Sequence, residues 1–412
     1  MSTYLAPHFY PQFECTGPTC EDTCCSGWRV DIDRRTFEKY RKVRHVELAP
    51  LMKQTLVKNP AAGASKGTGY ASLTMKRDGD CHFLQPDKLC SVQRVLGSEA
   101  LSDTCAIYPR HVNRFGAQQE RSLGISCPTA ARLVLMNPEP IRFETFSQDA
   151  GLTGRASFGF QFPEKNEGDP EQVAILNDFR ALILALLQWR ELELGARLML
   201  LGSLMEDVDQ IASSDTFRHA REVLPTLSAY AAMLGDPARV RQQFEQVPSD
   251  LSKKLELMTG LLGGALKLGA RMRFQECLTD AADGLDATPE MDIFQRYRDS
   301  HERYVRPYFQ AQGHILENYL VNQVFFRMFP FVRGTYLDLF REMVFNLAIL
   351  QVLLVGLAAR HQGLNDTLVL KLFQSYARKS DHNSSHLQTL RQALPADTQN
   401  SFIKLLWLVK EM

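Results

Sequence analysis

Apolar residues recur at three- and four-residue steps along most of the second half of the chain. Val173, Leu176, Phe179, Ile183 and Leu187 form the first such series, and this spacing places apolar side chains on one face of a helix. Further helical patterns cover residues 193–211, 216–234, 251–267, 312–328, 334–360, 366–379 and 398–411. Regular alternation of apolar and polar residues is nearly absent there. The pattern therefore predicts an almost entirely α-helical domain over residues 171–412.

The first part of the chain follows a different pattern. Trp28, Val30 and Ile32 alternate with polar residues, which predicts a short strand. Asp33 follows directly and is a typical N-cap of a helix. A chain of 412 residues also exceeds the usual size of one hydrophobic core. We therefore expect a mainly α protein with a small cysteine-rich N-terminal module with little strand at 1–145, a linker at 146–170 and the helical domain at 171–412.

Neither charge nor hydropathy indicates nucleic acid or a membrane as a partner. Lys and Arg together number 47, as do Asp and Glu, and phosphate binding needs a surplus of basic residues. The most apolar stretch, 343–359, contains Asn346 and Gln351 and is shorter than the roughly 20 residues of a bilayer span, so a buried core helix is expected. The N-terminus lacks a basic region followed by an apolar one, which predicts no signal peptide and a cytoplasmic location.

Eight of the nine cysteines lie in the predicted module. The first group is Cys15-x4-Cys20-x3-Cys24-Cys25, and the second is Cys81-x8-Cys90-x14-Cys105-x21-Cys127. A disulfide framework requires an oxidising compartment and usually an even number of cysteines, and the sequence indicates neither. We therefore predict that these eight cysteines are metal ligands, whereas Cys277 in the helical region is expected to be a small buried hydrophobe.

Zinc and iron–sulfur clusters are the two kinds of centre that suit such a set of thiols. Structural zinc favours paired Cys-x2–4-Cys knuckles, and only the first group offers anything similar. The neighbouring side chains of Cys24 and Cys25 diverge, which suits a cluster with several irons better than one small ion. Eight thiols suffice for two four-cysteine centres or for one centre with four spectators. We expect an iron–sulfur cluster of the 4Fe–4S type, with zinc as the alternative.

Three runs of sequence carry a family resemblance. They are ECTGPTCEDTCCSGWRVDIDRRTFEKY, then CHFLQPDKLCSVQRVLGSEALSDTCAIYPR, and finally Leu316–Asn322 continuing to Phe329-Pro330-Phe331. Together they resemble the flagellin lysine-N-methylase family. The runs lie in both predicted domains. The resemblance implies an N-terminal domain that chelates zinc or iron. It also implies transfer of methyl groups from S-adenosylmethionine to lysine ε-amines of flagellin, with an iron–sulfur cluster involved.

The site for the methyl donor is less evident from the sequence. No strand is followed by a Gly-rich turn and a helix in the style of a dinucleotide site. Cys20-x3-Cys24 is followed directly by Cys25, which departs from the usual three-cysteine radical motif. Asn318 and Asn322 share a predicted helix face and Tyr319 lies beside them. These three are candidate donor-binding residues, and satisfied buried amides are the alternative. The sequence identifies no catalytic residue.

Two other functions fit the same cysteines. The first is a non-catalytic module that is stapled by zinc and binds a protein partner. The second is a redox sensor in which Cys24 and Cys25 report oxidation. The metal content distinguishes them, because iron with acid-labile sulfide favours the methyltransferase, stoichiometric zinc favours the binding module, and a reversible disulfide without metal favours the sensor.

Overall fold

The computed structural model describes residues 3–60, 69–115, 118–147, 161–162, 169–212, 219–267, 272–286, 291–331, 335–381, 385–395 and 401–410. Most of the predicted linker at 146–170 lies outside these residues. The chain divides into two units. The first comprises Met1–Leu133 and Arg142–Gln161, and the second comprises Val134–Ile141 and Phe162–Met412. The short segment Val134–Ile141 therefore belongs to the second unit, although the chain on both sides of it belongs to the first.

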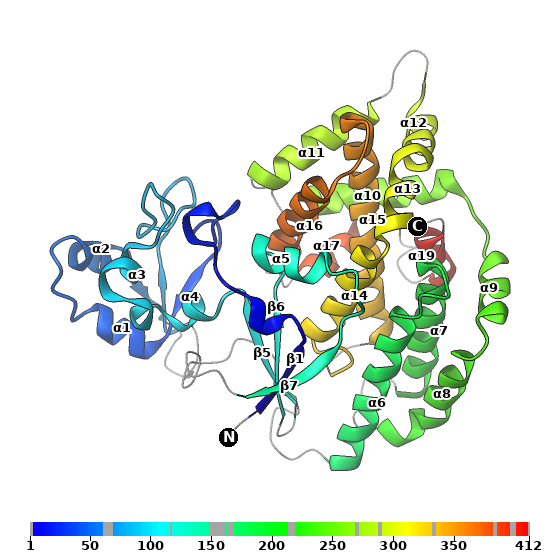
Figure 1. The fold of residues 1–412 in the computed structure, drawn as a ribbon, viewed down its shortest axis with the longest axis horizontal. Coiled ribbons are helices and arrows are strands. Elements are labelled where there is room, and N and C mark those ends of the chain that lie inside the picture. Colours follow the sequence, from blue (N-terminus) through cyan, green and yellow to red (C-terminus); the bar gives the residue numbers. More distant parts are fainter. Residues whose placement is uncertain are drawn as a thin grey trace. The chain divides into compact units, whose positions relative to one another are not determined.

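The first unit contains two β-sheets (Figure 1). The larger one has the strand order β7-β1-β6-β5-β8 and consists of β1 (Thr3–Pro7), β5 (Arg110–Phe115), β6 (Gln118–Leu123), β7 (Phe143–Ser147) and β8 (Gln161–Phe162). In it, β1 runs parallel to β6, with Tyr4 opposite Gln119, and antiparallel to β7. The smaller, antiparallel sheet has the order β2-β4-β3 and consists of β2 (Val30–Ile32), β3 (Leu56–Lys58) and β4 (Ala71–Leu73).

Short helices complete this unit. They are α1 (Arg34–Tyr40), α2 (Leu48–Thr55), α3 (Ser91–Leu96), α4 (Asp103–Ile107) and α5 (Pro128–Leu135), with 3-10 turns η1 (Tyr10–Gln12), η2 (Gly17–Thr19) and η3 (Ser98–Ala100). The predicted strand at Val30–Ile32 and the N-cap at Asp33 are confirmed. One carboxylate oxygen of Asp33 accepts the Thr36 N–H at 2.8 Å, and the other accepts the Asp103 N–H at 3.1 Å. Asp33 therefore ties α1 to α4.

The expectation of little strand in the module was wrong. The strands are two to six residues long, which is too short for a reliable alternating pattern. In β6 the polar residues Glu120, Arg121 and Ser122 are all buried, so the strand does not read as apolar and polar in turn. The Arg121 guanidinium lies over the ring of Tyr4 at 3.9 Å. A cation that packs on an aromatic ring replaces the apolar contact that the pattern requires.

The second unit is helical, which confirms the prediction of a mainly α protein. Its helices are α6 (Pro170–Leu187), α7 (Leu194–Ala212), α8 (Ala220–Met233), α9 (Pro237–Glu245), α10 (Leu251–Lys267), α11 (Met272–Leu285), α12 (Ile293–Ser300), α13 (Arg306–Gln312), α14 (His314–Phe326), α15 (Tyr336–His361), α16 (Asp366–Ser380), α17 (His386–Gln392) and α19 (Phe402–Val409). A π-helical turn, η5 (His301–Val305), joins α12 to α13. The eight predicted helical ranges correspond to α6, α7, α8, α10, α14, α15, α16 and α19.

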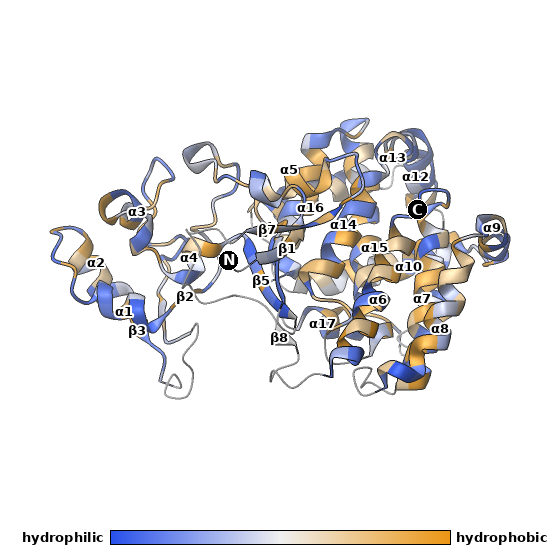
Figure 2. Cartoon of the chain, turned by 60° about the horizontal axis from the view of Figure 1, so that its bottom comes forward, coloured by the Kyte–Doolittle hydropathy of each residue, from blue (hydrophilic) through white to orange (hydrophobic). Residues whose placement is uncertain are grey.

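Helix α15 forms the centre of the helical unit. Most of this helix is coloured as hydrophobic in Figure 2. Among the described residues it is the one helix that is long and apolar enough to cross a membrane, but 89% of its most apolar window is buried inside the unit. Burial of this kind is what a core helix of a globular protein shows.

Helix α11 crosses α15 at two glycines. A Cβ atom built on Gly284 would lie 1.9 Å from the carbonyl oxygen of Gly356, and one built on Gly356 would lie 2.4 Å from the carbonyl oxygen of Ala281. These oxygens belong to the main chain of packed helices and have little room to move. The helices therefore meet through their backbones, and only glycine permits this distance.

We expect Gly284→Ala to destabilise the protein by about 1–3 kcal/mol, because the new methyl group overpacks a helix crossing. The matched control is Gly263→Ala in α10, since a Cβ atom built on Gly263 would meet no described atom within 4 Å beyond its own helix. That change should be neutral or stabilise the helix by up to about 1 kcal/mol. Urea unfolding of both variants measures the difference, and equal midpoints for the two would contradict the proposed crossing.

Candidate functional site

Main-chain hydrogen bonds bring the two cysteine groups together in the first unit. The N–H of Cys81 donates to the carbonyl of Cys25 at 2.8 Å. Beside it, the N–H of Gly27 donates to the carbonyl of Gly79, also at 2.8 Å. Both glycines have positive φ, 78° and 87°, a conformation that residues with a Cβ atom rarely adopt. The turn residues of the sequence thus place a cysteine of the first group beside one of the second.

Four thiols form the first thiol neighbourhood: Cys25, Cys81, Cys90 and Cys105. Burial raises the pKa of Cys81 to about 11, and the charges of Cys25 and Cys90 raise it further. Close packing around its sulfur raises the pKa of Cys105 to about 12, although the residue as a whole is exposed. Cys25, Cys90 and Cys81 raise it as well. Neighbouring thiols therefore raise one another's pKa values, because like charges that lie close together disfavour ionisation.

Three thiols form the second thiol neighbourhood: Cys15, Cys20 and Cys127. The ion pair of Glu21 with Arg132, at 2.8 Å, holds the loop of the first cysteine group against α5, which begins directly after Cys127. Burial raises the pKa of Cys127 to about 11, and Cys20 and Cys15 raise it further. This neighbourhood, like the first, therefore combines thiols from both sequence groups.

Cys24 connects the two neighbourhoods. A hydrogen bond with Cys25 and burial raise its pKa well above the ordinary value of a thiol, and the charges of Cys25, Cys105 and Cys15 add to the shift. Cys24 and Cys25, which are adjacent in the sequence, thus interact with different sets of thiols.

The thiols have the chemistry of a metal centre but not its closed geometry. Over the described parts of the chain, which include all eight cysteines of the module, no three His, Cys, Asp or Glu side chains form a group that could hold a metal ion. Thiols with raised pKa values are neutral near pH 7, and a bound cation would favour their ionised form. The assignment of the eight cysteines as ligands therefore stays a prediction.

The helical unit contains a cavity of about 1230 Å³. Its wall is built from α7, α9, α10, α12, η5, α13, α14 and α15, together with Pro138, Lys410 and the turn before α7. Small-molecule sites usually have volumes of roughly 300–1,000 Å³. The cavity is therefore large enough for a ligand of nucleoside size, and it lies within one unit.

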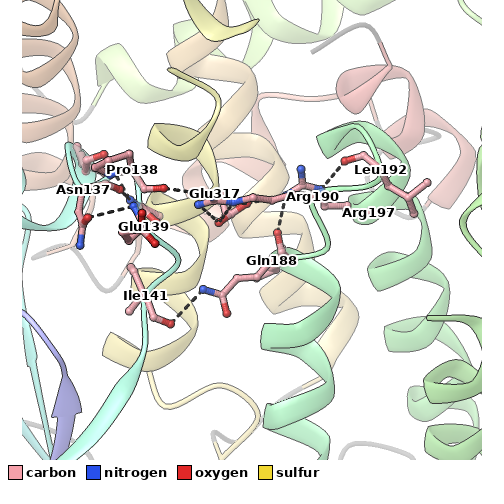
Figure 3. A network of polar contacts seen from close by, with 12 residues as sticks. Asn137, Pro138, Glu139, Ile141, Gln188, Arg190, Leu192, Arg197 and Glu317 are labelled. Atoms are coloured by element: carbon pink, nitrogen blue, oxygen red, sulfur yellow. Dashed lines mark hydrogen bonds and ion pairs between the residues drawn. The ribbon is translucent and has the colours of Figure 1, made fainter. Parts of the chain in front are cut away.

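A buried carboxylate forms part of the cavity wall. Glu317 is 2% exposed, and its oxygens accept hydrogen bonds from two guanidinium groups (Figure 3). Arg190 approaches in a bidentate manner, with N···O distances of 2.8–3.1 Å, and Arg197 approaches at 2.8 Å. Arg197 also donates to the carbonyls of Leu192 and Leu187. Burial lowers the pKa of Arg197, and the bond and charge of Glu317 oppose this shift.

The same network fixes the segment Val134–Ile141 on the helices of its unit. Arg190 donates to the carbonyl of Pro138 at 3.0 Å, and Gln188 donates to the carbonyl of Ile141 at 3.1 Å (Figure 3). Asn318 donates to the carbonyl of Asn137 at 2.7 Å. Three side chains thus satisfy main-chain acceptors of a segment that has no strand or helix partner for them.

The three candidate donor-binding residues lie on α14 and do not line the cavity. Asn318, Tyr319 and Asn322 are buried. The ring of Tyr319 meets that of Phe373 edge to face at 5.3 Å. The structure brings the three together on one helix but gives them packing and anchoring contacts. Their role in donor binding stays a prediction.

The residues that build the cavity could not be identified from the sequence. Glu317 carried a usable signal, because a lone acid inside an apolar helical run needs a cationic partner when it is buried. Its partner Arg197 lies 120 residues earlier, and no local pattern points to a partner at that distance. His301 and His314, which also line the cavity, are isolated in the sequence.

Comparison with known proteins gives one family and a small set of relatives. Residues 180–408 match the model of the FliB lysine N-methylase C-terminal domain. The chain is 29% identical over 137 residues to the flagellar biosynthetic protein FliU of Salmonella muenchen, which is 33% of this chain and 79% of that protein. Matches of the same length and identity to lysine-N-methylases of Salmonella typhimurium and Salmonella choleraesuis span only 33% of each protein. No solved structure matches the chain.

We expect Glu317→Gln to destabilise the helical unit by about 3–5 kcal/mol, because the change leaves the buried Arg197 without its counter-charge. Glu302→Gln is the control. The ion pair of Glu302 with Arg306 has the same 2.8 Å distance, but both side chains are more than half exposed, so its loss should cost less than about 1 kcal/mol. Chemical denaturation compares the two variants, and equal losses would show that the Glu317 network is not a stabilising element.

Proposed function

Because this chain belongs to the FliB lysine N-methylase family, we propose that it is a protein-lysine N-methyltransferase that acts on flagellin. The observation that carries the proposal is the family match over residues 180–408, more than half of the chain. The names of the matching proteins, two lysine-N-methylases and a flagellar biosynthetic protein, support both the reaction and the substrate. Flagellin is then a protein partner, and no nucleic acid or membrane span is part of the proposal. We also propose a cytoplasmic location.

The proposed reaction transfers a methyl group from S-adenosylmethionine. The neutral lysine Nζ forms a bond to the methyl carbon, the bond between this carbon and sulfur breaks, and its electron pair stays on the sulfur of S-adenosylhomocysteine. The methylated ammonium then releases a proton. Lysine must lose one proton before it attacks, and nearby positive charge favours the neutral amine. The cationic sulfonium of the donor is itself such a charge.

A proton acceptor is also available in this wall. Burial and the charge of Arg190 lower the pKa of His314 below that of an ordinary histidine, against the opposing charges of Glu317 and Asp366. The imidazole is therefore neutral near pH 7 and able to take a proton. The donor-binding hypothesis for Asn318, Tyr319 and Asn322 stays a separate proposal, because the three lie on α14 with His314 and Glu317 but do not line the cavity.

We propose further that the eight cysteines hold an iron–sulfur cluster, with zinc as the alternative. The two thiol neighbourhoods support this proposal, because each gathers thiols from distant parts of the chain. When bound, such a centre would supply metal–thiolate bonds that couple metal binding to the folding of the module. The redox-sensor alternative is less well supported, because sensor cysteines have low pKa values, whereas a hydrogen bond with Cys25 and burial raise the pKa of Cys24.

The methyltransferase proposal predicts a gain of about 14 Da, or a multiple of it, on lysines of flagellin that is incubated with the full-length protein and S-adenosylmethionine. This mass is that of the methylene group which each transfer adds. Intact-mass and peptide mass spectrometry measure the gain. Flagellin incubated without the donor is the control. An unchanged lysine mass, with folded and metal-replete protein, would remove the enzymatic proposal and favour a non-catalytic binding module.

The cluster proposal predicts that anaerobically purified protein contains iron and acid-labile sulfide. Cys25→Ser and Cys90→Ser should each lower the iron content, because serine keeps the shape of cysteine but is a far poorer ligand. Cys277→Ser is the matched control, since Cys277 is buried in α11 of the helical unit. Full iron content in both module variants would contradict the ligand assignment. Stoichiometric zinc in place of iron would favour the zinc alternative.

A further inference from the structure

The lining of the cavity in the helical unit carries more positive than negative charge. The basic residues are Arg190, Arg197, Lys254, Arg298, Arg306 and Lys410, and the acidic residues are Glu191, Glu193, Glu302 and Glu317. The carboxylate of Glu317 is already bound by two guanidinium groups. Because basic and acidic side chains both line the cavity, a ligand that carries a carboxylate together with cationic groups finds partners of both signs.

Two lysines concentrate this charge at one end of the cavity. Lys254 is only 4% exposed, and its Nζ atom donates to the carbonyl of Lys410 at 2.5 Å. The Nζ atom of Lys410 in turn donates to the carbonyl of Phe244 at 2.7 Å. An ammonium group has three N–H donors, and these bonds to carbonyls orient both ammonium groups. Such a pair of fixed positive charges suits a carboxylate.

Two aromatic rings, those of Tyr297 and His301, stand in the cavity wall. The rings of Tyr297 and His301 are parallel to within 6°, with centroids 6.2 Å apart, and both residues line the cavity. Leu350 and Leu354 of α15 supply apolar contacts in the same wall. Parallel rings beside an apolar wall bind flat heteroaromatic groups well.

The backbone around these rings is unusual. His301 begins the π-helical turn η5, which also presents Glu302 and Val305 to the cavity. Short π-helical turns are rare and occur often at functional sites. In the same wall, the Nε2 atom of His314 is buried and has no hydrogen-bond partner among the described residues. A buried polar atom without a partner in a cavity wall is expected where a ligand completes the site.

We propose that this cavity is the binding site of the methyl donor, an amino acid joined through a sulfonium to an adenosine. Lys254 and Lys410 hold its carboxylate, and its adenine packs on His301, whose ring is itself stacked on Tyr297. This inference rests on the proposed methyltransferase function. A triphosphate is disfavoured as the ligand, because three further acids face the cavity and the sequence has no Walker-type phosphate loop.

The volume of the cavity supports a reaction in the same place. About 1230 Å³ exceeds the space that a ligand of nucleoside size occupies, since sites for such ligands usually measure roughly 300–1,000 Å³. The remaining space admits an extended lysine side chain next to the donor.

The test is the affinity of the full-length protein for S-adenosylhomocysteine, measured by isothermal titration calorimetry. This probe has the carboxylate and adenine of the donor but transfers nothing. We expect Lys254→Met to weaken binding by about 10- to 100-fold, the effect of losing one charge-assisted hydrogen bond. The control is Lys253→Met, because Lys253 is the adjacent, exposed lysine and pairs with Asp250 instead of lining the cavity.

A second pair of variants tests the site at an exposed residue, because substitution of the buried Lys254 can disturb folding. Arg298 is exposed and lines the cavity, whereas Arg303, also exposed, lies on the same stretch of helix and does not line it. Arg298→Gln should weaken binding measurably and Arg303→Gln should not. Unchanged affinity in both Lys254→Met and Arg298→Gln would overturn the site. Binding of ATP, but not of S-adenosylhomocysteine, that depends on Lys254 would overturn the ligand class.

The outcome is separable from that of the proposed function. Flagellin methylation with unaltered affinity in all cavity variants would refute this donor site and leave the enzymatic function intact. Binding of S-adenosylhomocysteine that depends on Lys254 and Arg298, with no methylation of flagellin, would support the site and refute flagellin as the substrate.

Discussion

The helical unit depends on one buried carboxylate. Glu317 lies on α14, and its two oxygens compensate the guanidinium groups of Arg190 and Arg197, which stand in the turn before α7 and at the start of that helix. Burial of a charged carboxylate has a large desolvation free energy, and only partners held in good geometry offset it. Those partners also bind main-chain carbonyls. The network therefore fixes the position of three chain segments at once and shapes one end of the cavity.

Eight of the helices in the second unit could be predicted from the sequence, because each has a local apolar period, whereas α9, α11, α12, α13 and α17 were not predicted. This holds for α15, whose apolar residues are almost continuous, and for α6, whose spacing is regular. The strands could not be predicted in the same way. β6 buries Glu120, Arg121 and Ser122, and their partners come from other parts of the chain. The residues of the cavity could not be predicted for a similar reason. Its charged residues come from several elements, and only the packing of these elements brings them together.

The arrangement of the cysteines could be predicted only in part. Their clustering in the sequence indicates a shared chemistry, and the structure gathers them in one unit. The partition differs from the sequence order, because Cys25 joins Cys81, Cys90 and Cys105, whereas Cys127 joins Cys15 and Cys20. A loop can return over many residues at modest entropic cost. The spacing of the cysteines therefore predicts that they share one function. Which thiols lie next to each other depends on the geometry of the sheets and turns.

The segment Val134–Ile141 makes the helical unit discontinuous along the gene. The chain enters this unit at residue 134, leaves it after 141 and enters it again at 162. A single cut at any position therefore cannot release the complete unit. A fragment that begins at residue 162, or at residue 180 where the family match starts, would lack the carbonyl acceptors of Gln188, Arg190 and Asn318. Deletion mapping by truncation would therefore report the loss of this small insertion together with the loss of the cysteine module, and attribute both to the module.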